Sequence, residues 1–112
     1  MTFNNPSLTS FVFHFIIIVM IIENLQWDEF NINHISRHNI TPEEVEEVFF
    51  NGDISPRIER GRNNRYYILG QTFSGQYIFV VSEYLGKGKI RPITARDMTA
   101  SERKRFESRC NK

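Results

Sequence analysis

The sequence predicts an α+β domain in which two helices precede a small antiparallel sheet and a third helix follows it. Two Thr-x-x-Glu capping boxes mark helix starts, and after Gly52 the hydrophobic and polar residues alternate as they do in strands. With 112 residues, 40% hydrophobic content and 10 phenylalanines, the chain can bury one core but is too small for a separate cofactor domain.

The N-terminal region contains one apolar run, Phe11–Ile22, interrupted by a single histidine. This run is shorter than the ~20 residues that a transmembrane helix needs, and it lacks the positive start and cleavage site of a secretory signal. Its β-branched and aromatic residues favour a strand. Initiation at Met20 is an equal alternative, with Met20–Trp27 as the first strand, 20–112 as the domain and 1–19 as an extension upstream. A weak membrane-surface anchor is the minor alternative.

The first helix is predicted to begin after Asp28 as N-cap and to run to His38. Asn39 is a residue that can adopt the left-handed conformation with which helices often end. The apolar positions assigned to its buried side are Phe30, Ile32 and Ile35.

The second helix is marked by Thr41-Pro42-Glu43-Glu44, with a threonine N-cap, proline at the first helical position and glutamate at the third. It is predicted to stop at Asn51-Gly52. The spacing of its apolar residues predicts a buried stripe made of Val45, Val48 and Phe49.

Four strands are predicted after Gly52: Arg57–Gly61, Arg65–Gln71, Gln76–Tyr84 and Lys89–Ala95. The residues between them favour tight turns: Asn63-Asn64, Ser74-Gly75 and Gly86-Lys87-Gly88. Strands joined by such short turns pair in antiparallel fashion, so we expect a meander.

The C-terminal helix is predicted to begin at Thr99-Ala100-Ser101-Glu102, the second capping box. Phe106 and Cys110 are its available apolar contacts. Because Cys110 is the lone cysteine, it cannot form an intrachain disulfide, which fits a reducing compartment. We therefore expect a cytoplasmic protein.

The charges are unevenly distributed along the chain. Residues 1–52 hold one arginine against seven acidic residues, a net charge of −6, whereas residues 53–112 hold 13 cations against six acids, a net charge of +7. A basic sheet opposite an acidic helical layer would suit a polyanion such as nucleic acid. A solvated surface of ion pairs is an equally good interpretation of the charges alone.

The chain contains the side chains that metal-independent RNA cleavage requires. That reaction needs groups that hold the phosphate and groups that transfer protons to and from the reacting oxygens. Cations on or beside the strands are candidates for the phosphate, and tyrosines could stack on bases, although a strand tyrosine is more often ordinary sheet packing. The residues concerned are Arg57, Arg60, Arg62, Arg65, Arg91 and Arg96, with Tyr66, Tyr67, Tyr77 and Tyr84. For Arg96, a structural pair with Asp97 is the alternative.

His34 and His38 are four residues apart, so they project from one side of a helix. They could bind a metal, transfer protons or serve a structural role; no third ligand lies at a persuasive spacing, so we expect no metal and no other cofactor. The chain has no glycine-rich phosphate loop and no serine in a nucleophile elbow, which argues against Walker-type nucleotide hydrolysis and serine hydrolase chemistry.

Several blocks of the sequence, in order, resemble the BrnT-type toxins of bacterial type II toxin-antitoxin systems. The resemblance covers about Met20 to Arg109. The blocks are Trp27-Asp28-Glu29, His38, Thr41 to Phe49, Gly70-Gln71-Thr72, and Ile93 to Thr99 with Glu102-Arg103.

The resemblance implies a compact RelE-like endoribonuclease toxin that cuts RNA without a metal. It also implies an antitoxin that neutralises this activity and a joint complex through which the toxin reaches operator DNA. Arg65 and Arg96 match basic positions of these toxins, and His38 matches a histidine that usually precedes a glycine, which is Asn39 here. We therefore expect Arg65 and Arg96 to hold the scissile phosphate together and His38 or His34 to transfer a proton.

Two further departures concern Asn31, where many relatives have a basic residue, and Gln71, where many have arginine. With these departures His34 becomes an alternative acid or base. A degenerate, non-catalytic toxin that still binds an antitoxin is the alternative function, and a membrane-associated small protein is the third.

Overall fold

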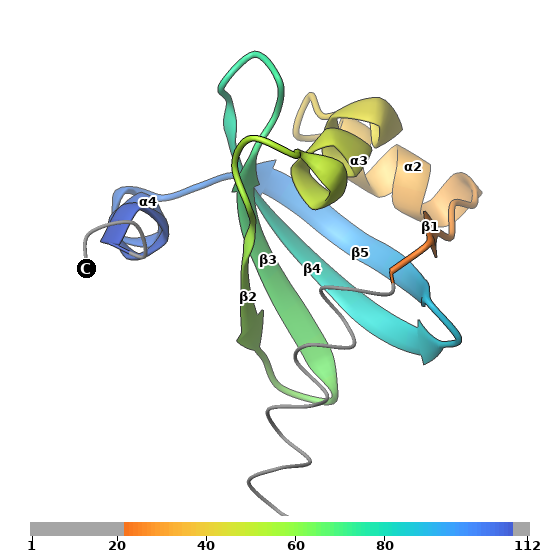
Figure 1. Ribbon diagram of the computed structural model, residues 1–112. Coiled ribbons are helices and arrows are strands. Elements are labelled where there is room, and N and C mark those ends of the chain that lie inside the picture. Colours follow the sequence, from red (N-terminus) through yellow and green to blue (C-terminus); the bar gives the residue numbers. More distant parts are fainter. Residues whose placement is uncertain (1–21, 109–112) are drawn as a thin grey trace, which may run out of the picture.

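The computed structural model describes residues 22–108 and has a five-stranded sheet between two helical layers (Figure 1). Helices α2 and α3 cover one face of the sheet, and α4 lies against the other. In chain order the elements are β1 (Asn24–Leu25), α2 (Glu29–Ser36), α3 (Pro42–Phe50), β2 (Arg57–Arg60), β3 (Arg65–Gln71), β4 (Tyr77–Gly86), β5 (Lys89–Asp97) and α4 (Ala100–Ser108). None of the helices described is long and apolar enough to cross a membrane.

The sheet has the strand order β1-β5-β4-β3-β2, and β2 to β5 form the predicted antiparallel meander. The predicted α+β class, with its two earlier helices and one later helix, is confirmed. β1 adds a parallel pair at the edge, with Asn24 opposite Lys89 and Leu25 opposite Ile90. The predicted 1–19 extension, the start at Met20 and Cys110 lie outside the described residues.

The turns between the strands form where they were predicted, because their residues accept positive φ. Asn63 and Asn64 have φ of 56° and 60°, Gly75 has 95°, and Lys87 has 56° between two glycines. Asn39 adopts the predicted left-handed conformation, at φ 61°, in the turn that follows α2.

The main core lies between the sheet and the pair α2 and α3. Val45 and Val48 of α3 are fully buried, as the apolar spacing predicts, and pack with strand residues such as Ile68, Ile78 and Val80. α3 approaches β3 so closely that a Cβ placed on Gly70 would lie 2.8 Å from the Cγ1 of Val48. Position 70 therefore accommodates α3 only as glycine.

The first helix differs from its prediction. It ends at Ser36 rather than His38, and Phe30 and Ile32 are exposed by 83% and 38%, whereas Asn31 is buried. The cause is the capping box: the Asp28 side chain accepts from the Asn31 N–H, and the Asn31 Oδ1 accepts from the Asp28 N–H. This reciprocal pair fixes the rotation of α2 so that positions 31 and 35 face the sheet.

The side-chain amide of Asn31 also forms hydrogen bonds with the residue after β1 and with β5. Its Nδ2 donates to the carbonyl oxygens of Gln26 and Pro92, both at 2.9 Å. Together with the bond from the Asp28 N–H to the Asn31 Oδ1, these satisfy every polar atom of the buried side chain. The residue therefore connects α2, the chain after β1, and β5.

The second face of the sheet holds a smaller core. Phe106 of α4 is 2% exposed and packs with Leu69 of β3 and Phe79 of β4. Thr99 and Glu102 form the predicted capping box at the start of α4, with N–H to side-chain distances of 2.9 and 3.1 Å. Phe106 is thus the buried apolar contact that the sequence predicted for this helix.

Candidate nucleic-acid interface

The β2–β3 hairpin carries three exposed arginines, Arg60, Arg62 and Arg65, around the Asn63-Asn64 turn. Backbone bonds close the turn, from Gly61 N to Arg65 O at 2.8 Å and from Arg65 N to Arg62 O at 3.0 Å. Within residues 22–108, none of the three guanidinium groups forms an ion pair. Their charge is therefore available to an external anion.

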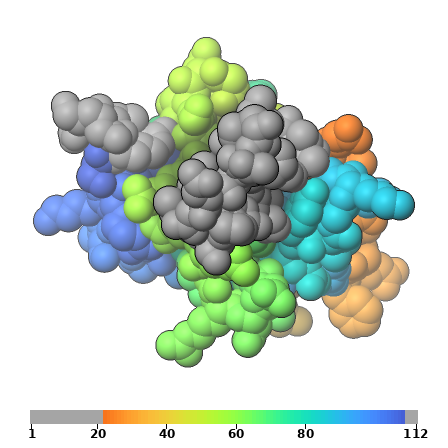
Figure 2. Space-filling model, turned by 60° about the horizontal axis from the view of Figure 1, so that its bottom comes forward, coloured from red at the N-terminus to blue at the C-terminus, as the bar shows by residue number. Residues whose placement is uncertain are grey.

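The neighbouring β4–β5 hairpin adds Lys87 and Lys89, both exposed and both without an ion pair among the residues described. β3 and β5 are both antiparallel to β4 and therefore point in the same direction. The turns that precede them, and with them the two hairpins, thus lie at the same end of the sheet. Both project on the side that Figure 2 brings forward, the β2–β3 hairpin in green and the β4–β5 hairpin in cyan. We call the five residues Arg60, Arg62, Arg65, Lys87 and Lys89 the basic hairpin end.

Arg96 lies on β5 at the opposite end of the sheet and is already paired. Its two terminal nitrogens donate to both carboxylate oxygens of Glu102 at 2.8 and 2.9 Å, and its guanidinium carbon lies 4.4 Å from the centre of the Phe79 ring. The Glu102 hydrogen bond raises the pKa of Arg96. The alternative pairing with the Asp97 side chain is wrong, because only the backbone carbonyl of Asp97 accepts from Arg96.

Arg65 and Arg96 share the face of the sheet on which α4 packs, but they are not adjacent. Arg65 is opposite Glu83, whereas Arg96 is opposite Phe79, which in turn is opposite Leu69 of β3. Four residues along the strand and two strand spacings separate them, which corresponds to about 16 Å between Cα atoms. The backbone therefore does not place the two arginines next to each other around one shared anion position.

The remaining predicted RNA contacts are engaged within the protein. Arg57 pairs with Glu59 at 2.8 Å, and Arg91 pairs with Asp28 at 2.9 Å. Tyr77 donates to Glu107 at 2.9 Å, and its ring lies 3.8 Å from the guanidinium carbon of Arg103. Tyr67 packs against Phe79 with ring centres 5.3 Å apart.

His34 and His38 are both exposed, with ring centres 6.1 Å apart. His34 belongs to α2 and His38 to the turn after it, so both lie in the helical layer, while Arg65, Arg96 and α4 are on the other face. The structure therefore does not bring the four predicted catalytic residues together. In residues 22–108, no group of three or more His, Cys, Asp or Glu side chains is placed to hold a metal ion.

A family model described as the ribonuclease toxin, BrnT, of type II toxin-antitoxin systems matches residues 27–102, about two thirds of the chain. The chain belongs to the BrnT toxin family. The resemblance seen in the sequence blocks is thereby confirmed. No curated protein matches the sequence.

The crystal structure of the Brucella abortus ribonuclease toxin BrnT is similar to this BrnT-family domain. The TM-score is 0.54, with 18% sequence identity over 67% of this chain and 95% of that chain. At this identity the likeness shows the fold. All five cations of the basic hairpin end fall inside the matched segment 27–102.

The sequence predicts Lys87 as part of a turn and Lys89 as the start of a strand, and neither lysine is among the predicted RNA contacts. The signal that could have found them is the meander itself, which brings the first and third turns to one end of the sheet. In this BrnT-family domain the strand topology therefore brings the two lysines to the same end of the sheet as the three arginines, from which they are distant in sequence.

Two carboxylates link α4 of this BrnT-family domain to the sheet and make its stability depend on pH. Hydrogen bonds from Arg105 lower the pKa of Glu59, and those from Arg96 lower the pKa of Glu102, below the ordinary glutamate value of 4.5. The pKa of each carboxyl group is lower in the folded protein than in the unfolded chain. The stabilisation is therefore complete above the ordinary value and is lost as the pH falls through the pKa of the folded protein. We expect the melting temperature to drop steeply below about pH 4.5.

Melting curves from pH 7 to pH 3 measure this effect. The variant Glu59→Gln/Glu102→Gln should melt at a lower temperature than wild type at pH 7 and lose less on acidification. Glu43→Gln, an exposed carboxylate without an ion pair among the residues described, is the matched control. Equal acid sensitivity in wild type and the double variant would contradict the assignment.

Proposed function

We propose that this BrnT-family chain is an endoribonuclease toxin that cuts RNA in the cytoplasm without a metal cofactor. In the same proposal an antitoxin neutralises it, and the toxin reaches operator DNA only through the complex with that antitoxin. The observation that carries the proposal is the basic hairpin end, where five cations that form no ion pair within residues 22–108 gather on a domain of this family. Unpaired Lys and Arg side chains are what binding of an RNA backbone requires.

In the proposed mechanism the neighbouring 2′-OH loses its proton and attacks the phosphorus, and the bond to the 5′-oxygen breaks as that oxygen takes up a proton. The protein therefore supplies position, charge stabilisation and proton transfer. Arg65 contacts the phosphate that gains negative charge, with Arg60 and Arg62 on neighbouring phosphates. Arg96 binds a further phosphate when the RNA displaces Glu102 from it. Arg57, Arg91, Tyr67 and Tyr77 would contribute only after giving up the contacts described above.

Proton transfer is assigned in this proposal to His38 or His34, because histidine changes its charge near neutral pH. His34 belongs to α2 and His38 to the turn after it, and α2 packs against β5 on the face of the sheet opposite α4. An RNA chain that contacts Arg65 would therefore have to reach the helical face of the sheet as well to meet either imidazole.

Inducible expression in bacteria and cleavage of purified RNA in EDTA test the enzyme proposal. We expect wild type to arrest growth and to cleave RNA at the same rate with and without EDTA. Arg65→Ala/Arg96→Ala should cleave about 100-fold more slowly, the order of effect seen when one transition-state charge partner is removed. Because Arg96→Ala leaves Glu102 without its partner, Arg65→Ala alone tests phosphate binding without that structural effect.

Arg37→Ala is the matched control, since Arg37 is an exposed arginine beside α2 without an ion pair among the described residues. The proposal fails if wild type neither stops growth nor degrades RNA and the double variant behaves identically.

A non-catalytic module that binds an antitoxin is the second candidate function. The two-bond Arg96–Glu102 pair and the buried Asn31 favour it, because neither position presents a free cation. This alternative predicts that the protein binds the antitoxin tightly. It also predicts that RNA stays intact at every protein concentration.

A further inference from the structure

The exposed side of α3 combines acidic residues with an aromatic residue. At 100° per residue its outer side chains fall opposite the buried Val45 and Val48. Phe50, which is 46% exposed, is the one apolar residue on this outer side. The outer residues are Glu43, Glu46, Glu47 and Phe50.

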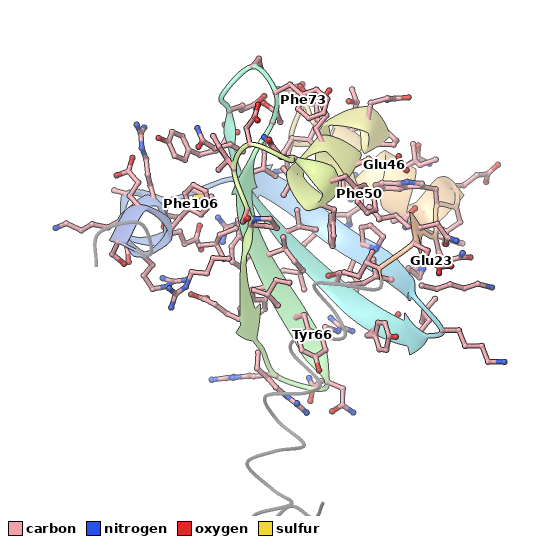
Figure 3. All side chains as sticks on the ribbon, viewed as in Figure 1. Glu23, Glu46, Phe50, Tyr66, Phe73 and Phe106 are labelled. Carbon is pink, nitrogen blue, oxygen red and sulfur yellow. The ribbon has the colours of Figure 1, made fainter. Side chains whose placement is uncertain are left out.

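Phe73, on the loop between β3 and β4, lies beside this side of α3 and is 70% exposed. Its N–H donates to the Glu47 carboxylate at 2.9 Å, which holds the loop against the helix. Figure 3 shows Phe73, Glu46 and Phe50 all on the α3 side of the molecule. Two exposed phenylalanines thus flank one stretch of carboxylates.

A hollow of about 400 Å³ adjoins these residues. It lies between segment 51–54, which follows Phe50, and segment 72–75, which contains Phe73, and Ile54 forms part of its lining. A hollow of this size accommodates an apolar side chain from outside. We call Glu43, Glu46, Glu47, Phe50 and Phe73, together with this hollow, the acidic aromatic face.

The carboxylates of this face are not neutralised within the described part of the chain. Glu43, Glu46 and Glu47 form no ion pair there; Glu46 accepts from the Trp27 Nε1 at 2.9 Å, and Glu47 accepts from the Phe73 N–H. Residues 22–52 as a whole hold one arginine against seven acidic residues. The negative charge of this face therefore favours a basic partner and repels RNA.

We propose that the acidic aromatic face is the docking surface for the antitoxin, through a basic segment that carries an apolar side chain. Exposed aromatic residues are typical anchors of protein interfaces, and the surrounding carboxylates would steer a basic segment to them. This inference rests on the proposed antitoxin partner. It places the antitoxin on the helical layer, while the RNA-binding cations occupy the hairpin end of the sheet.

The test uses the full chain and the antitoxin encoded by the neighbouring reading frame. Dissociation constants are measured by calorimetry for wild type, Phe50→Ser/Phe73→Ser and Glu43→Lys, and RNA cleavage is measured for each protein without antitoxin. We expect the double variant to bind the antitoxin at least tenfold more weakly, the usual effect of losing an aromatic anchor. Glu43→Lys should slow association and reduce its dependence on salt.

Phe30→Ser is the matched control, because Phe30 is an 83% exposed phenylalanine on α2, away from this face. Melting temperatures check that the substitutions at exposed positions leave the fold intact. The inference is supported if the double variant cleaves RNA as wild type does but resists neutralisation, while the Phe30 variant is neutralised normally.

Antitoxin binding of wild-type strength by Phe50→Ser/Phe73→Ser overturns the inference, as does a wild-type chain that does not bind the antitoxin. Loss of self-association in the double variant, with unchanged antitoxin binding, would assign the face to a second copy and overturn the inference as well. If wild type binds the antitoxin but cuts no RNA, the enzyme proposal fails while the variants still decide the docking surface.

Discussion

Replacing Arg60, Arg62 and Arg65 with alanine is expected to weaken RNA binding by about 100-fold at 0.1 M salt. Each phosphate contact to single-stranded nucleic acid contributes about 0.7 to the slope of log K against log salt, so three lost contacts reduce the slope by about 2. If wild type and the triple variant bind RNA with equal affinity at 1 M salt, their affinities then differ by about two orders of magnitude at 0.1 M salt. Cleavage should fall with binding.

Fluorescence anisotropy with a single-stranded RNA at several KCl concentrations measures both the affinity and the slope. Arg37→Ala removes an exposed arginine from the helical layer and should leave the slope of RNA binding unchanged. Because the Arg60 guanidinium carbon lies 5.6 Å from the centre of the Tyr66 ring, a melting curve must accompany the triple variant. A triple variant with the wild-type slope would show that RNA binds elsewhere.

Asn31→Asp is expected to destabilise the fold at neutral pH by about 3–5 kcal/mol, the usual cost of an uncompensated buried charge. The substitution keeps the shape of the side chain and replaces the donating NH₂ with an oxygen. That oxygen would face the carbonyl oxygens of Gln26 and Pro92, to which Asn31 donates at 2.9 Å. The two carbonyl oxygens and the buried carboxylate are all hydrogen-bond acceptors, so no hydrogen bond can form among them.

The pH dependence separates this effect from a simple loss of packing. Burial raises the pKa of a carboxyl group in the folded state, so the Asn31→Asp variant should regain stability as the pH falls through that value. Asn33→Asp, at an exposed position of the same helix, is the control and should change the free energy of unfolding little. Urea unfolding at pH 7 and pH 5 tests this, and equal stability of the two variants at pH 7 would refute the assignment.

Local chemistry explains why much of the fold could be predicted. The capping boxes at Thr41 and Thr99, and the asparagines at positions 39, 63 and 64, act through backbone atoms only a few residues away. The orientation of α2 could not be predicted in the same way. Phe30 and Ile32 suggested an apolar side, but the cap between Asp28 and Asn31, together with the Pro92 carbonyl 61 residues further on, turned Asn31 inward.

The candidate site was harder to predict because its contacts connect residues that are distant in the chain. Arg96 and Asp97 are neighbours in sequence, but consecutive strand residues point to opposite faces, and α4 then brings Glu102 to the face of Arg96. The types of candidate residue were visible in the sequence. Whether each cation was free or paired depended on the register of the strands.

The amide of Asn31 has a consequence for the border of the sheet. Along the outer edge of β5, the carbonyl oxygens of Gly88, Ile90 and Pro92 accept in turn from Glu23 N, Gln26 N and Asn31 Nδ2. Beyond the end of β1, the side chain of Asn31 from α2 thus provides the next hydrogen bond to β5. Pro92 itself has no N–H with which to bind a further strand. Along this stretch β5 gives an incoming strand little to pair with, which protects the sheet against edge-to-edge aggregation.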